Sequence, residues 1–302
     1  MILTVTLNAA LDVTYEVPGV VWDGVNRVGA VHRRAGGKGV NVARVLAALG
    51  QEVLVTGLAG GPTGRAVEAD LRAAGLPGAL VPIAADSRTT LVVSETPGGG
   101  ATLFNEPGPE VTRDELRNFV KTYESLLEDA QAVVLSGSLP RGVPDGTYAS
   151  LAALAAAAGV PAIVDADGEP LRHAPRGRPA IVKPNAEELA RAVPHGTPEE
   201  GAEALRGQGA EAVVVSMGPA GLLAVTPEGT LRARMPYEVE GNPTGAGDSL
   251  VAGLALGLVE HCSWPDRLRR AAALGAAAVA APVAGDFDRA VYADILPLIE
   301  IA

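Results

Sequence analysis

Short runs of valine, isoleucine and leucine alternate along this sequence with longer segments of helical periodicity. Such alternation is typical of a parallel sheet whose helices cover both of its faces. After a buried strand at residues 1–7, the pattern predicts strands at residues 52–56, 132–135, 162–165, 180–182 and 212–216. It predicts helices at residues 63–75, 112–129, 145–158, 186–207, 249–261, 266–281 and 289–299. We therefore expect one doubly wound α/β domain, with a mostly parallel sheet flanked by helices, over residues 1–302.

Two stretches do not follow this alternation, and both consist of two short strand-like runs around a turn. One has runs at residues 13–17 and 27–33 around Asp23-Gly24, and the other has runs at residues 89–95 and 101–105 around Pro97-Gly98-Gly99-Gly100. Glycine-rich turns between strands favour antiparallel hairpins. We expect a small discontinuous β lid, approximately residues 12–34 and 88–106, that projects over a site. Two surface hairpins without a role in binding are the alternative.

Composition excludes several classes of protein. There are 24 Lys and Arg against 35 Asp and Glu, a formal net charge of −11, which argues against a broad nucleic-acid surface. The single cysteine, Cys262, excludes an intramolecular disulfide and a cysteine-rich zinc site and favours a reducing compartment. The N-terminus has no basic region before its apolar run, and no convincing membrane span follows. We expect a soluble, cytoplasmic protein without nucleic-acid or membrane partners.

The strongest chemical signal is Asn242-Pro-Thr-Gly-Ala-Gly-Asp248, a glycine-containing turn that opens a helix. Backbone N–H groups of Gly245, Ala246 and Gly247 at a helix start would favour a phosphate or a phosphoryl group in transfer. A carboxylate at position 248 would repel phosphate, unless it takes a proton from an attacking hydroxyl. The alternative is that Asp248 only stabilises the first turn of its own helix.

A second glycine-rich loop, Ala35-Gly36-Gly37-Lys38-Gly39-Val40-Asn41, precedes a predicted helix. It fails the Walker A pattern because glycine rather than serine or threonine follows Lys38, and it fails the dinucleotide fingerprint because Val42 replaces the third glycine. What remains is a tight backbone, a cation and an amide, which suits a small anionic molecule. A plain helix-entry loop with a solvated Lys38 is the alternative.

Two further segments, Lys183-Pro-Asn185-Ala-Glu-Glu188 and Ser216-Met-Gly218-Pro-Ala-Gly221, follow predicted strands. Open α/β sheets bind their ligands at the carboxyl ends of strands. Glu188 lies three residues beyond Asn185, so it suits either a helix capping box or the water shell of a magnesium ion.

These segments occur in the order and rough spacing of a known family. Five matches support this: the Gly36-to-Asn41 loop, Ser136-Gly-Ser138-Leu-Pro140, Lys183-Pro-Asn185 with Glu188, Ser216-Met-Gly218, and Thr244-Gly-Ala-Gly-Asp248. Over essentially its whole length the chain resembles the ribokinase-like carbohydrate kinases of the phosphofructokinase-B family. It looks most like the hexose-phosphate branch, 1-phosphofructokinases and tagatose-6-phosphate kinases, because of Thr6-Leu-Asn8-Ala-Ala-Leu-Asp12, Val25-Asn26-Arg27 and Lys38.

The resemblance implies a role for each matching residue. Asp248 would be the catalytic base, and the amides of Gly245, Ala246 and Gly247 would stabilise the phosphoryl group. The acceptor sugar phosphate would contact Asp12, Arg27, Gly36, Gly37, Lys38, Asn41, Arg88 and Ser138, with Arg27, Arg88 and Ser138 receiving its phosphate. The nucleotide would lie against Lys183, Asn185, Ser216, Gly218 and Gly221, with Glu188 holding Mg²⁺ indirectly through water.

The resemblance therefore implies an ATP- and Mg²⁺-dependent kinase that phosphorylates a primary hydroxyl of a ketohexose monophosphate. Fructose 1-phosphate is the first choice of acceptor; tagatose 6-phosphate and fructose 6-phosphate stay open. A neutral-sugar or nucleoside kinase and a non-catalytic sugar-phosphate sensor are more distant alternatives. Activation by K⁺ occurs in the family, although the sequence assigns no ligands to it. A homodimer through the lid also stays open, because Arg33, Arg34 and Glu95 could equally block pairing of its edge strands.

Overall fold

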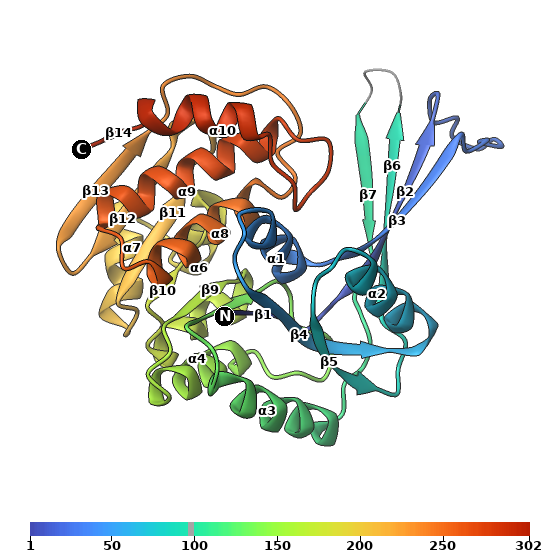
Figure 1. The fold of residues 1–302 in the computed structure, drawn as a ribbon, viewed down its shortest axis with the longest axis horizontal. Coiled ribbons are helices and arrows are strands. Elements are labelled where there is room, and N and C mark those ends of the chain that lie inside the picture. Colours follow the sequence, from blue (N-terminus) through green and yellow to red (C-terminus); the bar gives the residue numbers. More distant parts are fainter. Residues whose placement is uncertain (96–99) are drawn as a thin grey trace.

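The described residues form two β-sheets of very different size. The structure is a computed structural model that describes residues 1–95 and 100–302, so Pro97, Gly98 and Gly99 of the second predicted turn lie outside the described residues. A ten-stranded sheet forms the body of the molecule, and a four-stranded sheet stands away from it (Figure 1).

The large sheet is mostly parallel, as predicted. Its parallel part runs in the spatial order β11 (Ala212–Ser216), β10 (Ile181–Val182), β9 (Ala162–Asp165), β8 (Ala132–Ser136), β1 (Ile2–Thr6), β4 (Val53–Gly60) and β5 (Gly78–Ile83). Beyond β11 the sheet continues antiparallel with β12 (Leu222–Thr226), β13 (Gly229–Arg234) and β14 (Glu300–Ile301). These three antiparallel strands and β5 were not among the strands that the sequence pattern predicts.

Helices cover both faces of this sheet because side chains of each buried strand alternate between two hydrophobic cores. Val134 and Val214 belong to the core under one layer, whereas Val133 and Val213 belong to the other. The first layer contains α1 (Lys38–Ala48), α2 (Gly61–Ala73), α8 (Ala246–Val259), α9 (Trp264–Val279) and α10 (Arg289–Ile295). The second contains α3 (Arg113–Leu127), α4 (Thr147–Ala157), α5 (Gly168–His173), α6 (Ala186–Ala192) and α7 (Pro198–Gly207).

The single helix predicted at residues 186–207 is wrong. The chain leaves the helical conformation after α6, where His195 and Gly196 both have positive φ, at 74° and 100°. Pro194 removes a backbone donor at the same place. Thr197 then begins α7 with a capping box to Glu200, so two short helices replace one long one.

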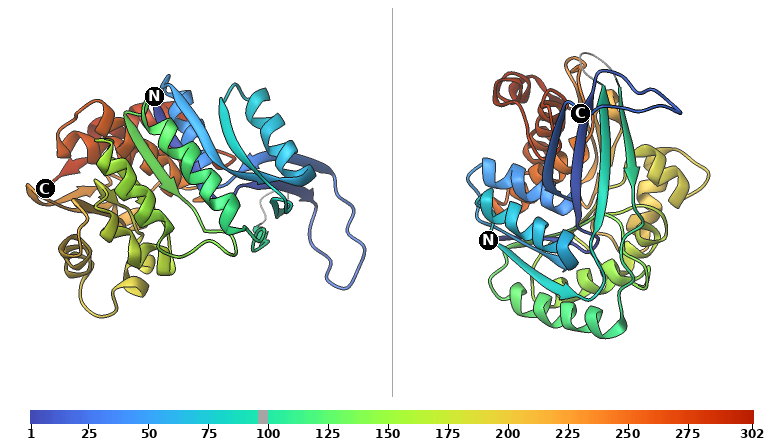
Figure 2. Two further views of the ribbon diagram at one scale, coloured as in Figure 1. Left: turned by 90° about the horizontal axis from the view of Figure 1, so that it is seen from below. Right: turned by 90° about the vertical axis from the view of Figure 1, so that its right-hand side faces the viewer.

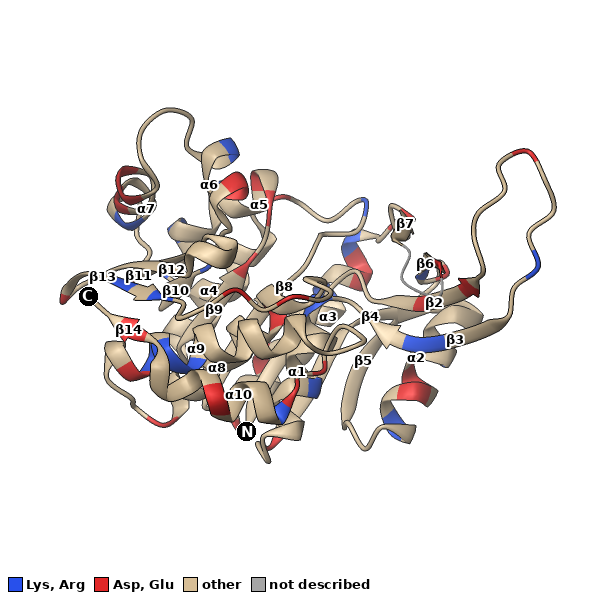
Figure 3. Ribbon diagram, turned by 90° about the horizontal axis from the view of Figure 1, so that it is seen from above, with Lys and Arg blue, Asp and Glu red and all other residues tan. Residues whose placement is uncertain are grey.

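The small sheet contains the two predicted hairpins. The strands β2 (Ala10–Val17) and β3 (Ala30–Gly36) pair antiparallel, as do β6 (Arg88–Glu95) and β7 (Ala101–Asn105), and a parallel contact between β2 and β6 joins the hairpins. The second strand of the first hairpin begins at Ala30 rather than at the predicted residue 27. Residues 18–29 instead form a loop that extends away from the rest of the molecule (Figures 2 and 3).

The order of strands locates the carboxyl edge at which a ligand is expected. β1 lies between β8 and β4, so connections that leave β1 and β8 diverge at this edge. The turn after β1 enters the small sheet directly, and β3 leads back into α1. In the part of the chain that the structure describes, no helix has both the length and the apolarity to cross a bilayer.

Candidate active site

A cleft of about 1680 Å³ lies between the carboxyl edge of the large sheet and the inner face of the small one. Predicted site residues from distant parts of the chain, from Asp12 to Asp248, lie together along this cleft. The cleft is lined by Asp12, Gly37, Lys38, Asn41, Arg88, Ser138, Lys183, Asn185, Glu188, Ser216, Gly218, Gly221, Gly245, Ala246, Gly247 and Asp248. Among the predicted site residues, only Arg27 and Gly36 do not line it.

The start of α8 has the geometry of an anion site. Gly245 precedes the helix with φ 86°, and a β-carbon there would lie 2.8 Å from Cβ of Ala284, so only glycine fits. The Ala246 N–H donates to the Pro243 carbonyl at 3.1 Å within the turn. The amides of Gly245 and Gly247 are therefore better placed than that of Ala246 to donate to an anion.

Asp248 is buried in the first turn of α8, with only 6% of its surface exposed. Its Oδ2 accepts a hydrogen bond of 2.8 Å from Nδ2 of Asn41. Burial raises the pKa of Asp248 to about 6, and the positive charge of Lys38 opposes part of this rise. A carboxyl group with this pKa is ionised at neutral pH and is a stronger base than an ordinary aspartate.

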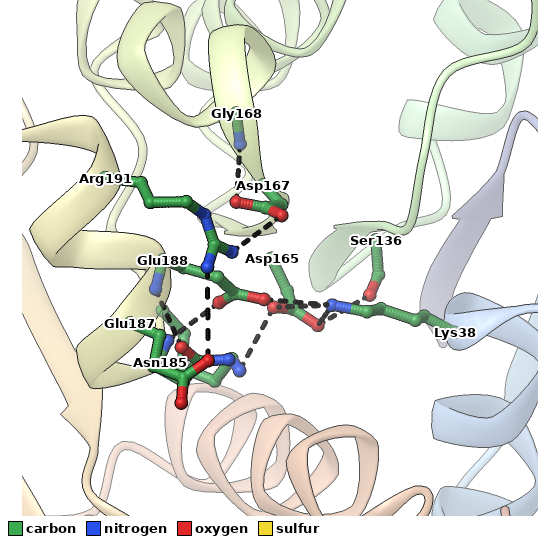
Figure 4. A network of polar contacts seen from close by, with 10 residues as sticks. Lys38, Ser136, Asp165, Asp167, Gly168, Asn185, Glu187, Glu188 and Arg191 are labelled. Atoms are coloured by element: carbon green, nitrogen blue, oxygen red, sulfur yellow. Dashed lines mark hydrogen bonds and ion pairs between the residues drawn. The ribbon is translucent and has the colours of Figure 1, made fainter.

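A buried carboxylate, Asp165, interacts with Asp248 and pairs with two lysines, Lys38 and Lys183. Figure 4 shows it beside Lys38 and Ser136. Nζ of Lys183 lies 3.1 Å from Oδ1 of Asp165, and Nζ of Lys38 lies 3.4 Å from Oδ2. Ser136 donates its hydroxyl hydrogen to the same carboxylate at 3.1 Å. Burial alone would raise the pKa of Asp165, but the two ammonium groups outweigh it and hold the pKa below its ordinary value. Asp165 in turn raises the pKa of Lys38, so Lys38 is charged.

The two lysines lie near the start of α8 and near Asp248. A β-carbon on Gly247 would lie 3.5 Å from Nζ of Lys183, which places this ammonium beside the amides at the start of α8. Lys38 interacts electrostatically with Asp248, and its Nζ is 3.9 Å from Oε1 of Glu188. The sequence analysis predicts Lys38 near the phosphate of the sugar, and this stays a prediction; in the structure its ammonium group lies beside the carboxylates of Asp165 and Glu188.

Glu188 forms the capping box of α6, and it also faces the cleft. Its Oε2 accepts from the Asn185 amide at 2.8 Å, and Oδ1 of Asn185 accepts from the Glu188 amide at 2.8 Å. The other oxygen, Oε1, is the one directed toward Lys38. The sequence left two roles open for Glu188, a capping box and the water shell of a magnesium ion. Oε2 forms the capping box, and Oε1 faces the cleft, so the second role stays a prediction for that oxygen.

The opposite end of the cleft is formed by the small sheet. Asp12 on β2 lies beside Thr90 on β6 and accepts a hydrogen bond from its hydroxyl. The Arg88 guanidinium donates to the Asn8 carbonyl at 3.1 Å and to Oγ1 of Thr90 at 3.3 Å. Nδ2 of Asn8 donates to Oγ of Ser138 at 3.1 Å. Burial raises the pKa of Asp12, while Thr90 and the nearby guanidinium of Arg88 oppose the rise.

Gly36 contributes by its lack of a side chain. A β-carbon at this position would lie 1.9 Å from Oδ2 of Asp12, so any larger residue would displace the carboxylate from its present position. Arg27 is placed differently: it lies exposed in the loop of residues 18–29, away from the cleft of its own chain.

The cleft has an apolar wall beyond Lys183, at the end where the sequence analysis predicts a nucleotide. Ser216 ends β11, and its amide donates to the Pro184 carbonyl at 3.0 Å, which joins the two predicted segments. Gly218 and Gly221 follow it at the cleft surface. The wall is formed by Leu222, Met235, Val239, Ala276 and Val279. A flat apolar ring would bury its faces there, while its phosphates could extend toward the lysines and the start of α8.

Three residues of the site were not predicted from the sequence. Thr90 and Arg34 lie on the small sheet and were not distinguishable from ordinary strand residues. Asp165 had a detectable signal, because a charged residue ends an otherwise apolar buried strand at the carboxyl edge. Its neighbour Asp167 lies nearer the surface, where it pairs with Arg191 at 2.9 Å (Figure 4).

Comparison with solved structures identifies the fold. Ribokinase from Arabidopsis thaliana, solved with ribose and ATP, matches with a TM-score of 0.73 over 98% of both chains, at 22% sequence identity. The fold is therefore ribokinase-like, as the sequence resemblance implied.

The particular family follows from the sequence match. Residues 5–288 match the pfkB family of carbohydrate kinases, and the chain belongs to that family. Phosphofructokinase-2 from Escherichia coli, solved with potassium, matches with a TM-score of 0.90 at 32% identity over 98% of both chains. A structure described as a possible 1-phosphofructokinase, from Thermotoga maritima, matches with a TM-score of 0.89 at 26% identity, over 100% of this chain and 98% of the other. The predicted family is thus confirmed, and with it a sugar kinase.

Proposed function

We propose that this sugar kinase transfers the γ-phosphoryl group of ATP to a primary hydroxyl of a ketohexose monophosphate. The carrying observation is the polarity of the cleft. A base and an anion site, Asp248 and the start of α8, lie at one end, and Arg88 beside Asp12 lies at the other. With a neutral sugar, the Arg88 guanidinium would have the nearby carboxylates of Asp12 and Glu106 as anionic neighbours and none on the acceptor. A sugar phosphate would pair with it through charge-assisted hydrogen bonds.

The proposed reaction needs one proton acceptor and several positive groups. The Asp248 carboxylate takes the proton of the acceptor hydroxyl as its oxygen attacks the γ-phosphorus, and Asn41 keeps the carboxylate oriented by its hydrogen bond. The new P–O bond forms as the bond to the β-phosphate oxygen breaks, and ADP leaves. The amides of Gly245 and Gly247, with Lys38 and Lys183, would stabilise the negative charge of the transferring group.

Magnesium belongs to this proposal. No cluster of three His, Cys, Asp or Glu side chains suited to a metal occurs among residues 1–95 and 100–302. Mg²⁺ commonly binds nucleotide phosphates with only one or two protein carboxylates and several waters. The cleft-facing oxygen of Glu188 fits that mode, so we propose that it holds Mg²⁺ through water. When bound, the ion neutralises phosphate charge. A potassium ion, present in the Escherichia coli phosphofructokinase-2 structure, is proposed as a second cofactor without assigned ligands.

Fructose 1-phosphate is the proposed acceptor, giving fructose 1,6-bisphosphate. Tagatose 6-phosphate and fructose 6-phosphate are the close alternatives, because each furanose also has a phosphate at one end and a primary hydroxyl at the other. Escherichia coli phosphofructokinase-2, one of the structural matches, was solved with fructose 6-phosphate. An ADP-coupled assay with the three sugar phosphates and free fructose decides between them. Turnover of fructose alone would refute the sugar-phosphate proposal.

One variant and one measurement on the wild type separate this function from its remaining rivals. In a neutral-sugar or nucleoside kinase, Arg88→Ala would change turnover of all acceptors equally. In the proposed kinase it raises KM for the sugar phosphate much more than KM for ATP. A non-catalytic sensor would bind sugar phosphate without producing ADP in the wild type. The buried base Asp248 beside an amide-lined helix start favours the kinase.

We also propose a homodimer through the small sheet, in a reducing, cytoplasmic setting. The exposed large apolar side chains of this region include Val21, Trp22, Val25, Val28, Val31, Leu103 and Phe104. Exposure of so many large apolar side chains to water is unfavourable, and a second copy of the chain packed against the small sheet would bury them. In such a dimer the loop of Arg27 would face the other copy, and its proposed contact with the sugar phosphate depends on this arrangement. Sedimentation of wild type and Trp22→Asp tests it: a wild-type monomer would exclude the dimer.

A further inference from the structure

Arg34 connects the small sheet to a loop on the opposite side of the cleft. It lies near the end of β3, half-buried at the cleft, and its Nη1 donates to the Ala284 carbonyl at 3.0 Å. The two residues are 250 positions apart in the sequence. The residues 280–286 that contain Ala284 follow α9 and precede α10.

The loop of Ala284 touches two parts of the catalytic apparatus. A β-carbon on Gly245 would lie 2.8 Å from Cβ of Ala284, so this loop packs directly behind the proposed anion site. On its other side, a β-carbon on Gly285 would lie 3.0 Å from Oδ1 of Asn41. Asn41 is the residue that donates to Asp248. One short loop therefore supports both the amides and the orientation of the base.

The charges around Arg34 fit a fixed guanidinium. Burial lowers the pKa of Arg34, and repulsion by Arg44 adds to this effect. The carboxylates of Asp286, Asp70 and Asp12 attract the group and oppose the shift. The adjacent Arg33 is exposed on the same strand. Because consecutive side chains of a strand point to opposite faces, Arg33 carries the same charge without the same surroundings.

We propose that Arg34 is a positioning residue for phosphoryl transfer, which through Ala284 holds the loop supporting Gly245 and Asn41. It touches neither reacting group in this role. Removing it would leave the loop free to move, and with it the amides and the base. The kinetic part of the inference rests on the proposed function, whereas the mobility of the loop does not.

Hydrogen–deuterium exchange of the protein without substrates is the first test. Arg34→Ala is expected to increase exchange in peptides covering residues 241–249 and 280–288, whereas Arg33→Ala leaves both at the wild-type level. Arg34→Lys, which retains a charged donor on a long side chain, is expected to restore much of the protection. Melting temperatures of the three variants check that each remains folded, and the lysine variant provides the comparison if the alanine variant does not fold.

Steady-state kinetics with the sugar phosphate that the wild type accepts is the second test. Loss of a charge-assisted hydrogen bond that matters mainly in the transition state should lower kcat by roughly tenfold or more in Arg34→Ala. KM for the acceptor should stay within about twofold, and Arg33→Ala should match the wild type.

Three results would overturn the inference. Exchange in Arg34→Ala equal to wild type would show that the loop does not depend on this residue. A raised KM with unchanged kcat would mean that Arg34 binds substrate directly, and equal effects of Arg33→Ala and Arg34→Ala would reduce it to surface charge. If the wild type phosphorylates no sugar phosphate, the proposed function fails, and the exchange experiment alone decides the inference.

Discussion

Replacing Asp248 with asparagine should abolish turnover and at the same time stabilise the protein. Asparagine has nearly the same shape, and its side-chain carbonyl can still accept the hydrogen bond from Asn41. What it removes is a negative charge that is buried in the folded protein. The proton acceptor is lost with that charge, so kcat should fall by at least about a hundredfold.

The size of the stabilisation follows from the pKa of Asp248. Burial raises it from 3.8 to about 6, which corresponds to a free energy of about 3 kcal/mol. The folded state binds the proton more tightly than the unfolded state. The contribution of Asp248 to stability is therefore fully present below pH 3.8, is lost as the pH rises toward about 6, and stays lost above it. The asparagine variant has no such loss, so its advantage should approach about 3 kcal/mol at neutral pH.

Urea unfolding of both proteins at several pH values from 4.5 to 7.5 measures this difference. The free energy of unfolding of Asp248→Asn should exceed that of the wild type by an amount that grows with pH and levels off above about pH 6. In the wild type, kcat/KM should rise with pH and level off around the same value, because the ionised carboxylate is the active form.

Three results would refute this reasoning. If the variant were less stable than the wild type at pH 7.5, the ionised Asp248 carboxylate would not lower the free energy of unfolding. A constant difference over the whole pH range would mean that Asp248 titrates near its ordinary pKa. Residual turnover within tenfold of the wild type would exclude Asp248 as the proton acceptor.

Two further predictions concern residues around the base and the acceptor. Asp165→Asn removes the counter-charge that Lys38 and Lys183 share. It should therefore lower the free energy of unfolding, measured by urea denaturation, by about 3 to 5 kcal/mol. The control Asp167→Asn changes a half-exposed ion pair and should alter the free energy of unfolding by no more than about 1 kcal/mol. Gly36→Ala should displace the Asp12 carboxylate and raise KM for the sugar phosphate without raising KM for ATP, whereas Gly29→Ala, whose nearest contact would be at 3.5 Å, should leave both unchanged. If Asp165→Asn and Asp167→Asn had equal effects on stability, Asp165 would not be the counter-charge of the two lysines. If Gly36→Ala and Gly29→Ala had equal effects on KM, Gly36 would not be needed to place the Asp12 carboxylate.

The large sheet was predictable because its central strands are buried on both faces. A strand such as residues 132–135 is covered on both faces and is therefore apolar throughout. A short apolar run of this length, between turn signals, indicates a buried strand. The strand β13 gave a weaker signal because it includes charged residues such as Arg232 and Arg234, whereas β12 is buried throughout and apolar apart from Thr226, and was missed despite that pattern. The break between α6 and α7 had signals in the sequence, namely Pro194, Gly196 and the capping pattern of Thr197 with Glu200; only the positive φ at His195 had none of comparable strength.

The site was predictable where backbone conformation and chemistry coincide. The Gly245-to-Asp248 segment must combine a tight turn, a helix start and a carboxylate, which few sequences do. Where a role depends on long-range proximity, the sequence can at most draw attention to a residue, as the charge at the end of a buried strand does for Asp165, but it does not reveal the partners. Asp165 acquires its role only because β9 lies beside β10 and opposite the start of α1, so its lysine partners come from positions 127 and 18 residues away. Arg34 likewise depends on a contact with residue 284.

The connection between β3 and α1 links the two ends of the cleft that we propose for the acceptor and for the nucleotide. β3 ends at Gly36 and α1 begins at Lys38, so the strand that forms the acceptor side leads within two residues to an ammonium group held by Asp165. Asn41, one turn further, donates to Asp248. A displacement of the small sheet toward a bound sugar phosphate would therefore act on Lys38 and on the base through α1 itself. Closure over the acceptor and alignment of the phosphoryl-transfer groups would then be one motion, and water entering an open cleft would meet a misaligned base.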